Sequence, residues 1–503
     1  MSTPNIIFIT TDQQRTDSVG CYGSPWMATP NFDRMARGGV RFDRAYCTNA
    51  VCTPSRASIL SGRHLSRHGA WNVGLSVPDD EVFLSHRLRP LGYRTHLVGK
   101  AHFQAFGGTA EESIESIRAW RPRYPGFTGP YYGFETVELA LGHTIWGLAG
   151  HYGCWVEEKA GRRTDPLFAS HRRSAVEFGG EAYDWDLPVE LANSLWTGAR
   201  AAAFLEEAAA DGRPFFLSVG FEDPHHPHAV PVEIARQLDH GRAPLPRYAE
   251  GELADKPPHF IAAREGRLEA SPVRGQFPVA GQHTGFDFRP VGAEDARLGR
   301  SYYYALVELI DRGMGMILDA LERTGLDRTT LVVFTTDHGE LLGDHGLWMK
   351  GPFHYEQLVR VPLIVQLPGH EQAGRTVTSI ASLVDLAPTA LALLDLAVPG
   401  DLDGTSLLPV LRGGAAARDA CAFVETVDDP RGLRLKTVVG DRYKLTCYHG
   451  HRFGELYDLH DDPGEIRNRW SDPSYAEVKA DLLARLVDAG ERLEKRASRY
   501  CYA

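Results

Sequence analysis

Asn5-Ile6-Ile7-Phe8-Ile9-Thr10-Thr11 is a short run of apolar and β-branched residues that stops at Asp12. A continuous run of this kind is typical of a strand buried on both faces of a sheet. A second run, Val332-Val333-Phe334-Thr335-Thr336, also stops at an aspartate, Asp337. Ligands of open parallel sheets bind outside the carboxyl ends of the strands. The repeated ending therefore predicts that both carboxylates meet at one edge of a sheet, although two ordinary aspartate turns are the plainer alternative.

Similar runs and helical patterns alternate along the chain. The strand-like runs are 94–99, 215–220, 330–336 and 361–367, and the helical patterns are 30–36, 190–209 and 302–321. This alternation predicts a large α/β domain, a doubly wound and mostly parallel sheet with helices on both faces. Shorter alternating runs at 433–439 and 443–448 predict a small antiparallel sheet, followed by a terminal helix over 475–493. We expect one large domain over 1–413 and a small C-terminal α+β subdomain over 414–503.

The composition is that of a globular protein. Of the 503 residues, 43% are hydrophobic and 24% are charged, which excludes a disordered, collagen-like or coiled-coil chain. Lys+Arg number 54 against 65 Asp+Glu, so the formal net charge is -11. That balance gives no electrostatic reason to expect nucleic acid or an anionic membrane as a partner.

The cysteines and the apolar runs indicate the cellular compartment of the protein. The seven cysteines include no CxxC pair, which argues against a disulfide framework and against a zinc ribbon. The start of the chain lacks a basic region, and its apolar run, Ile6 to Ile9, is too short for a signal peptide. No stretch approaches the roughly 20 apolar residues of a membrane helix. We expect a cytoplasmic protein.

The segment Cys52-Thr53-Pro54-Ser55-Arg56 carries the clearest chemistry. A helix is predicted to begin near Pro54, and the free N–H groups at a helix start suit an anion and an activated thiol. A cysteine phosphatase needs five residues between its cysteine and its arginine, and position 58 is a serine, which excludes that class. A buried, inert cysteine beside a chance proline and arginine is the plainer alternative.

The pattern Cys-x-Pro-x-Arg resembles the signature of the type I sulfatases, which belong to the alkaline phosphatase superfamily. The resemblance extends along nearly the whole chain, through further segments that match the family in order. They are Lys100-Ala101-His102, Pro224-His225-His226-Pro227, Asp337-His338-Gly339, Lys350, Arg360-Val361-Pro362, Asp403-Gly404-Thr405 and Glu455-Leu456-Tyr457-Asp458. Together they are highly specific. The resemblance implies that residues 1–413 form a sulfatase-like catalytic domain that hydrolyses a small-molecule sulfate ester.

In this family a separate formylglycine-generating enzyme, a transient partner, oxidises the signature cysteine to Cα-formylglycine. By resemblance, Cys52 becomes an aldehyde that hydrates to a geminal diol. One metal-bound diol oxygen attacks sulfur, and the other lets the intermediate collapse and release sulfate. A serine in place of formylglycine would form a sulfate ester on the enzyme and would lack the second hydroxyl that releases the sulfate.

The resemblance also assigns the other site residues. Asp12, Asp337 and His338, with the oxygen derived from Cys52, would bind one divalent cation. Oxygen ligands suit Ca²⁺, Mg²⁺ or Mn²⁺ and a histidine nitrogen favours Mn²⁺, so we expect Ca²⁺ or Mn²⁺ and keep Mg²⁺ as an alternative. The remaining residues have catalytic or substrate-binding roles. Lys100 and Lys350 would hold the sulfate oxygens, Arg56 would orient the diol, His225 would protonate the leaving alcohol, His102 would assist sulfate release, and Gln13 and Asn72 would contact substrate.

Two residues differ from the family pattern, and they leave open whether the central atom of the ester is sulfur or phosphorus. Position 13 is Gln where many sulfatases have Asp, and position 338 is His where many have Asn. This pair resembles the branch of choline sulfatases and phosphonate monoester hydrolases. A less negative site suits any monoanionic ester, so phosphonate monoester or phosphodiester hydrolysis is the alternative, while Lys350 and the Arg360-Val361-Pro362 strand favour sulfur. A transferase or an inactive binding homologue remains as another class, although the complete polar set argues against an inactive one. The sequence does not identify the alcohol part of the ester. It does not fix the oligomeric state either, so a homo-oligomer remains an alternative.

Overall fold

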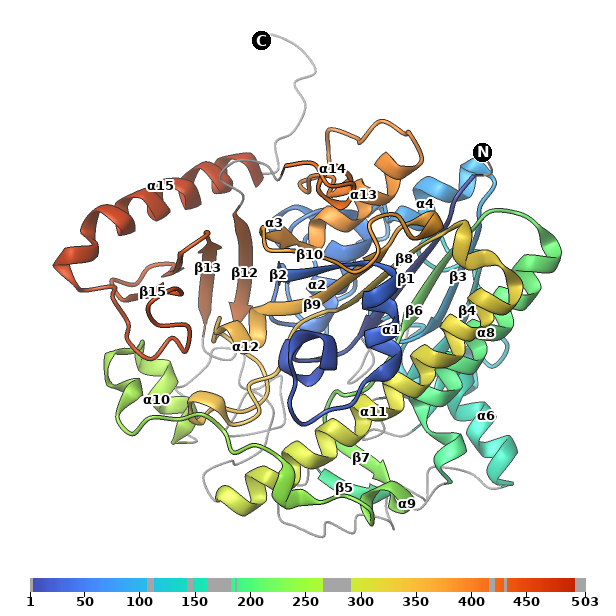
Figure 1. The fold of residues 1–503 in the computed structure, drawn as a ribbon, viewed down its shortest axis with the longest axis horizontal. Coiled ribbons are helices and arrows are strands. Elements are labelled where there is room, and N and C mark those ends of the chain that lie inside the picture. Colours follow the sequence, from blue (N-terminus) through green and yellow to red (C-terminus); the bar gives the residue numbers. More distant parts are fainter. Residues whose placement is uncertain are drawn as a thin grey trace.

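The computed structural model describes residues 3–105, 113–142, 148–161, 182–185, 188–265, 291–415, 421–428 and 432–493. Its largest element is a nine-stranded sheet covered by helices on both faces (Figure 1). The strands are β1 (Asn5–Thr11), β2 (Val40–Tyr46), β3 (Arg94–Gly99), β4 (Thr136–Leu141), β6 (Phe215–Gly220), β8 (Thr330–Thr336), β9 (Arg360–Gln366), β10 (Arg375–Val377) and β11 (Ala381–Ser382). The predicted α/β class with a mostly parallel sheet is confirmed.

The strand order places β1 at the centre. The order is β10-β2-β9-β8-β1-β6-β3-β4, with β11 paired to β2, and β1 runs parallel to both of its neighbours. Thr10 pairs with Thr335 and Thr11 with Thr336, so the two Thr-Thr-Asp endings lie side by side in register. Strand β9 is observed where an apolar run indicated a strand, but it runs antiparallel to β8 and β2. Its direction depends on the connections on either side, which the run itself does not encode.

The helices of the described chain lie on both faces of the large sheet and around the smaller C-terminal part (Figure 1). They are α1 (Pro30–Gly38), α2 (Cys52–Ser61), α3 (Leu65–His68), α4 (Leu84–Leu88), α5 (Ile117–Arg123), α6 (Gly150–Ala160), α8 (Asn193–Asp211), α9 (Val232–Ala235), α10 (Pro258–Arg264), α11 (Ala293–Thr324), α12 (Glu356–Val359), α13 (Leu386–Leu393), α14 (Leu408–Leu411) and α15 (Ala476–Leu493). Within the described ranges, no helix combines the length and the apolarity needed to cross a bilayer.

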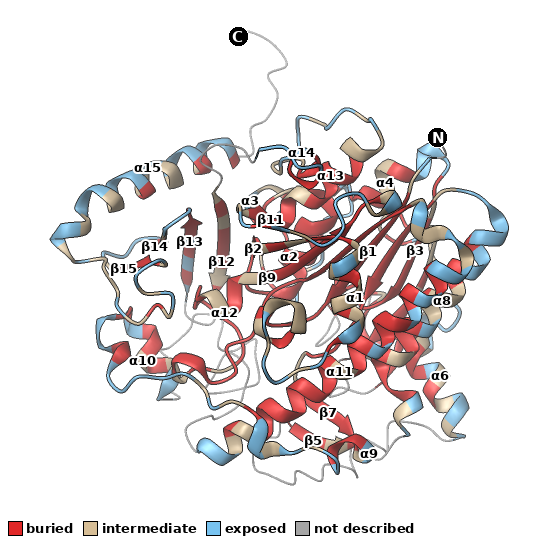
Figure 2. Cartoon of the chain, in the orientation of Figure 1, coloured by how far each residue is buried: buried red, intermediate tan, exposed pale blue. Residues whose placement is uncertain are grey.

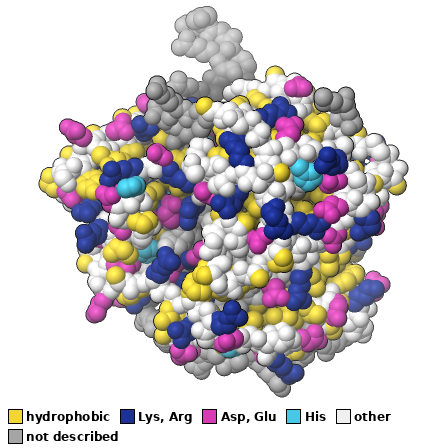
Figure 3. Space-filling view, in the orientation of Figure 1, with side chains coloured by type: hydrophobic (Ala, Val, Ile, Leu, Met, Phe, Trp, Pro, Cys, Tyr) yellow, Lys and Arg dark blue, Asp and Glu magenta, His cyan; other side chains and the backbone are white. Residues whose placement is uncertain are grey.

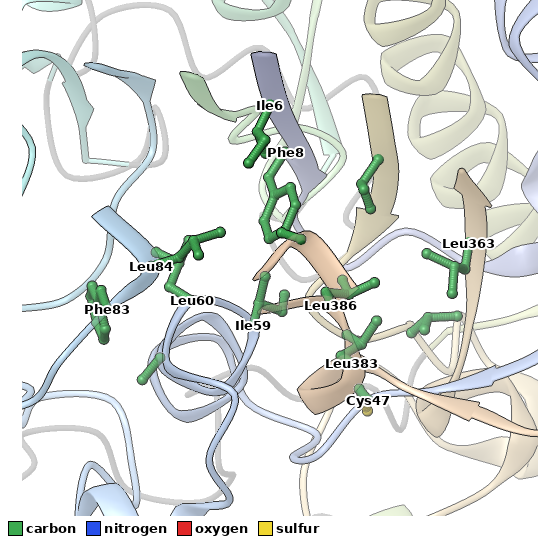
Figure 4. Packing of buried hydrophobic residues seen from close by; sticks show 14 of the residues in the cluster. Ile6, Phe8, Cys47, Ile59, Leu60, Phe83, Leu84, Leu363, Leu383 and Leu386 are labelled. Atoms are coloured by element: carbon green, nitrogen blue, oxygen red, sulfur yellow. The ribbon is translucent and has the colours of Figure 1, made fainter. Parts of the chain in front are cut away.

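Alternate side chains of β1 enter two different hydrophobic cores. Ile7 and Ile9 pack with residues of α1, α8 and α11 on one face. Ile6 and Phe8 point to the other face, toward Ile59 of α2 (Figure 4). This alternation is the period-2 geometry of a strand with both faces covered. The strands and the inward sides of the helices are buried (Figure 2), which fixes α2 against the carboxyl end of β1.

A smaller antiparallel sheet follows the large one. It has the order β12 (Ala422–Asp428), β13 (Leu433–Val439), β14 (Tyr443–Tyr448) and β15 (Gly454–Asp458), and α15 packs against it (Figure 1). A third, two-stranded sheet pairs β5 (Ala182–Trp185) with β7 (His228–Pro231). The predicted C-terminal sheet and helix are thus observed, while the domain boundary at residue 413 stays a prediction. Basic and acidic side chains are interspersed over the face seen in Figure 3, in keeping with the modest net charge.

Candidate active site

Two buried carboxylates lie at the carboxyl ends of the central strands. Asp12 follows β1 and Asp337 follows β8, and both are fully buried. Asp337 Oδ1 accepts hydrogen bonds from the backbone N–H of Gln13 at 3.0 Å and of His338 at 2.9 Å. The parallel register of β1 and β8 thus brings the two carboxylates together, as the repeated sequence ending predicted.

Helix α2 is anchored to these strand ends by its first turn. Its Arg56 forms a buried ion pair with Asp337, Nε to Oδ2 at 2.7 Å, and donates to the Thr11 carbonyl at 3.1 Å. Ser55 Oγ donates to the Asp337 carbonyl at 2.6 Å. These contacts hold the N-terminus of α2, and therefore Cys52, against the carboxylates.

The sulfur of Cys52 lies within a polar cluster. Its Sγ is 3.0 Å from Lys350 Nζ, 3.3 Å from His338 Nε2 and 3.5 Å from Asp12 Oδ1. Burial, with a further contribution from the Asp12 charge, raises the pKa of the Cys52 thiol to about 11. The unmodified side chain is therefore a protonated thiol near neutral pH and not a ready nucleophile.

The donor set around Cys52 fits a divalent cation. One potential ligand atom from each of Asp12, Cys52, Asp337 and His338 lies within 4.8 Å of the others. His338 Nδ1 is 2.8 Å from the Gly339 carbonyl, which can only accept, so Nδ1 carries the proton and the Nε2 lone pair faces the cluster. Burial also lowers the pKa of His338, which favours the neutral, ligating ring. Two carboxylates and one imidazole suit Ca²⁺ or Mn²⁺.

Lys100 reaches the cluster from the end of β3. Its ammonium pairs with Asp12 Oδ2, and both side chains are buried. β3 and β6 approach closely here, since a Cβ at Gly99 would collide with the Gly220 carbonyl and one at Gly220 with the Lys100 carbonyl. Burial raises the pKa of Asp12, but the charges of Lys100, His225, Lys350 and Arg56 outweigh burial and hold that pKa well below its usual range. Asp12 is therefore a carboxylate.

Lys350 joins the cluster from the loop after β8. Besides Cys52 Sγ, its Nζ is 2.9 Å from Gln13 Oε1 and 2.9 Å from His225 Nε2. His225 Nδ1 contacts the carbonyl of His226, so Nδ1 carries a proton and Nε2 faces Lys350. Lys350 therefore contacts both His225 and Cys52.

Glu340 is a site residue that the sequence reasoning missed. The Gln13 amide donates to Glu340 Oε2, and Leu342 N donates to Oε1 at 2.9 Å. Burial raises the pKa of Glu340, which lies 2% exposed. Gln13 therefore bridges Glu340 to Lys350. The only signal in the sequence was its position three residues after Asp337.

His102 and Asn72 are placed by different contacts. His102 is buried two residues after Lys100, and its backbone N–H donates to Glu115 at 2.8 Å. The Asn72 amide donates to the Val427 carbonyl of β12 at 3.3 Å, and its own oxygen accepts from Val73 N at 2.8 Å. The roles of these two residues in release and binding stay predictions.

Known proteins resemble this chain over nearly its full length. The family model described as Sulfatase matches residues 4–396, and one described as N-sulphoglucosamine sulphohydrolase, C-terminal, matches residues 343–492. The uncharacterized sulfatase YidJ of Escherichia coli (strain K12) is 29% identical over 499 residues, which cover 98% of this chain and 88% of that protein. The N-acetylglucosamine-6-O-sulfatase of Bacteroides thetaiotaomicron is 28% identical, covering 96% of this chain and 86% of that protein. Among solved structures, the phosphonate monoester hydrolase of Agrobacterium radiobacter matches with a TM-score of 0.78 at 25% identity, covering 97% of this chain and 96% of that chain.

Proposed function

This chain belongs to the sulfatase family and is a sulfuric ester hydrolase, and from that premise we propose that its nucleophile is made from Cys52. In this proposal a separate maturing enzyme oxidises Cys52 to Cα-formylglycine. The observation that carries it is the position of Cys52 Sγ, which contacts Lys350, His338 and Asp12 at the start of a buried helix. No other described cysteine has this set of neighbours.

The donor set indicates what the bound groups would contribute. A divalent cation held by Asp12, Asp337 and His338 would neutralise charge on the ester, and the hydrated aldehyde would supply one hydroxyl for attack and another for sulfate release. Arg56 keeps Asp337 oriented through its ion pair. Because hydrogen bonds and ion pairs already fix both carboxylates in place, the protein needs little rearrangement to hold the cation.

The basic residues would bind the charged end of the ester and manage the proton. Lys350 and Lys100 would hold sulfate oxygens. Lys350 Nζ lies 3.0 Å from Cys52 Sγ, and Lys100 pairs with Asp12, which itself contacts Cys52. His225 would donate a proton to the departing alcohol oxygen. Its Nε2 lies 2.9 Å from Lys350 Nζ, which in turn contacts the Cys52 position, so the proposed acid lies next to the group that would hold the ester. His102 would assist the release of sulfate.

Hydrolysis of a phosphonate monoester or phosphodiester is the second candidate. Gln13 places an uncharged amide beside Lys350, at a position where many sulfatases have Asp. Such a site suits any monoanionic ester. The resemblance to the Agrobacterium radiobacter structure favours the same alternative.

Steady-state kcat/KM for an aryl sulfate, an aryl phosphonate and an aryl phosphodiester with one common leaving group tests the assignment. We expect the sulfate to have the highest value and Cys52→Ala to abolish all three activities. A higher value for the phosphonate or the diester would reassign the central atom. Turnover by Cys52→Ala at the wild-type rate would refute the proposed nucleophile.

A further inference from the structure

A cavity of about 800 Å³ adjoins the cluster around Cys52. Lys350 is one of its lining residues, and the Lys350 ammonium is 3.0 Å from Cys52 Sγ. The other walls come from segments far apart in the chain, 245–265, 291–296 and 343–353. This volume lies within the roughly 300–1,000 Å³ of typical small-molecule sites. The cavity therefore has room for a molecule much larger than the sulfate group.

Apolar side chains dominate the described wall of this cavity. They include Leu245, Leu253, Ile261, Leu347, Trp348 and Phe353. Leu253, Leu347 and Phe353 are each less than 5% exposed, so they form a fixed floor rather than mobile surface groups. Burying an apolar ligand against such a wall releases water and is favourable in proportion to the area buried.

The charged groups of the wall are few and largely engaged. Among the described residues that line the cavity, they are Arg264, Glu265 and Lys350. The Arg264 guanidinium donates to the Gly346 carbonyl at 3.1 Å and lies 4.1 Å from the centre of the Tyr248 ring. The Lys350 ammonium contacts Cys52, Gln13 and His225. Against the described part of this wall, a polyhydroxylated sugar would lose water and gain few partners, at a cost for each unpaired hydroxyl. The guanidinium also covers the Tyr248 ring, which a quaternary ammonium would need.

From these observations we infer that the ester carries a large, mainly apolar alcohol, such as an aryl or fused-ring alcohol, which this cavity binds. The inference rests on the proposed function, because the alcohol must extend away from a sulfate group held between Lys350 and Cys52. Lys350 belongs to both the cluster and the cavity, so it marks the point where the charged end meets the apolar part. The cavity wall is then the determinant of substrate specificity.

The test compares kcat/KM for phenyl sulfate, 2-naphthyl sulfate and glucosamine 6-sulfate on matured enzyme. Phenol and naphthol are similar leaving groups, so their ratio reports the apolar area that the cavity buries. Since one methylene in an apolar pocket is worth about 10-fold or more, we expect 2-naphthyl sulfate to exceed phenyl sulfate by at least about 10-fold. Glucosamine 6-sulfate should be the poorest substrate.

Two variants test whether this cavity causes the preference. Ala254→Trp adds bulk at an exposed lining residue, and Trp348→Ala removes an aromatic wall. Each should reduce the naphthyl-to-phenyl ratio by about 10-fold. The matched controls are Ala209→Trp at an exposed position of α8 and Trp155→Ala on α6, neither of which lines the cavity, and both should keep the wild-type ratio.

The outcomes separate this inference from the proposed function. If the enzyme hydrolyses sulfate esters but shows no naphthyl preference, favours the sugar sulfate, or keeps its ratio in both cavity variants, the inference is wrong and the proposed function stands. If matured enzyme hydrolyses none of the three sulfates but turns over a phosphonate, the proposed sulfate specificity fails. In that case the same pair of aryl groups on the phosphonate tests the cavity.

Discussion

Lys350 links three other residues of the site. Its ammonium contacts the sulfur of Cys52, the amide of Gln13 and the imidazole of His225, all at 2.9–3.0 Å. The motif predicted a role for Lys350 in holding the anion. It did not predict that Gln13 and Glu340 would position it, because hydrogen bonds between distant loops have no periodic signal in a sequence.

Lys350→Ala is expected to lower kcat/KM for every leaving group by about 30- to 1000-fold. The reason is the loss of a charge-assisted contact in a shielded site, worth roughly 2–4 kcal/mol. Lys159→Ala, at an exposed position of α6, is the control and should keep wild-type kinetics. Small, equal effects from both substitutions would show that Lys350 does not bind the ester.

His225→Ala is expected to harm alkyl sulfates far more than nitrophenyl sulfate. An alkoxide needs a proton as it departs and nitrophenolate barely does, and general acids contribute about 10²–10⁴-fold. Kinetics with leaving groups of graded acidity measure the difference. His226→Ala, whose ring contacts the Gln13 amide at 3.1 Å, is the comparison and should not show this dependence on the leaving group. An equal loss for good and poor leaving groups in His225→Ala would assign the acid elsewhere, first to His102.

At the scale of elements, the buried strands were the most predictable features. β1, β3, β6 and β8 have the bounds that their apolar runs predicted, since a strand covered on both faces needs continuous apolar residues. β2 was not predicted, because Arg41, Asp43 and Arg44 interrupt its run of apolar residues. Its charged side chains are tolerated because they are only partly buried. The direction of β9 was equally unpredictable, because it depends on the connections on either side of the strand.

Asp337 lies where β1, β8 and α2 meet, and its contacts there predict how Asp337→Asn will behave. This variant should lose its divalent cation and most of its activity together, because an amide is a weaker ligand and leaves Arg56 without its 2.7 Å ion-pair partner. Elemental analysis of the purified protein, alongside kcat/KM, measures both losses. Asp327→Asn, outside the site, is the control and should retain metal and activity. Normal turnover by a metal-free preparation would contradict the assignment.

The turn before α13 predicts a pH dependence of stability. Burial raises the pKa of Asp385 from its ordinary 3.8 to about 6, although the backbone N–H groups of Thr405 and Ser382 act in the opposite direction. The folded state therefore holds this proton more tightly than the unfolded state. The stability that Asp385 contributes is present below pH 3.8 and is lost as the pH rises through 6, a total of about 3 kcal/mol.

Asp385→Asn removes this titration. The free energy of unfolding of the wild type, relative to that of the variant, should fall by about 2–3 kcal/mol between pH 4 and pH 7. Denaturant titrations across that range measure the difference. Asp441→Asn, whose side chain is 99% exposed, should parallel the wild type at every pH. A constant difference between wild type and Asp385→Asn would contradict the raised pKa.

At the scale of the whole molecule, the fold class and most of the polar cluster could be predicted, but the surroundings of the cluster could not. Asp12, Cys52, Asp337 and His338 follow strands or begin a helix, where a local motif also fixes the place in space. The large cavity joins the segments 245–265 and 343–353, which have no shared pattern and meet only in the folded chain. The segments 107–186 and 240–296 have weak helical or strand periodicity in the sequence, and parts of them, including Trp146, lie outside the described residues. We propose residues 1–413 as the catalytic domain.

Peptide mass spectrometry of the segment around Cys52, run beside kcat/KM on the same preparations, tests the central claim most directly. Protein made with the formylglycine-generating enzyme should carry oxygen in place of sulfur at residue 52. Across preparations of different maturation, activity toward aryl sulfate should rise in proportion to the modified fraction. Fully active protein that carries only the intact Cys52 thiol would contradict the account.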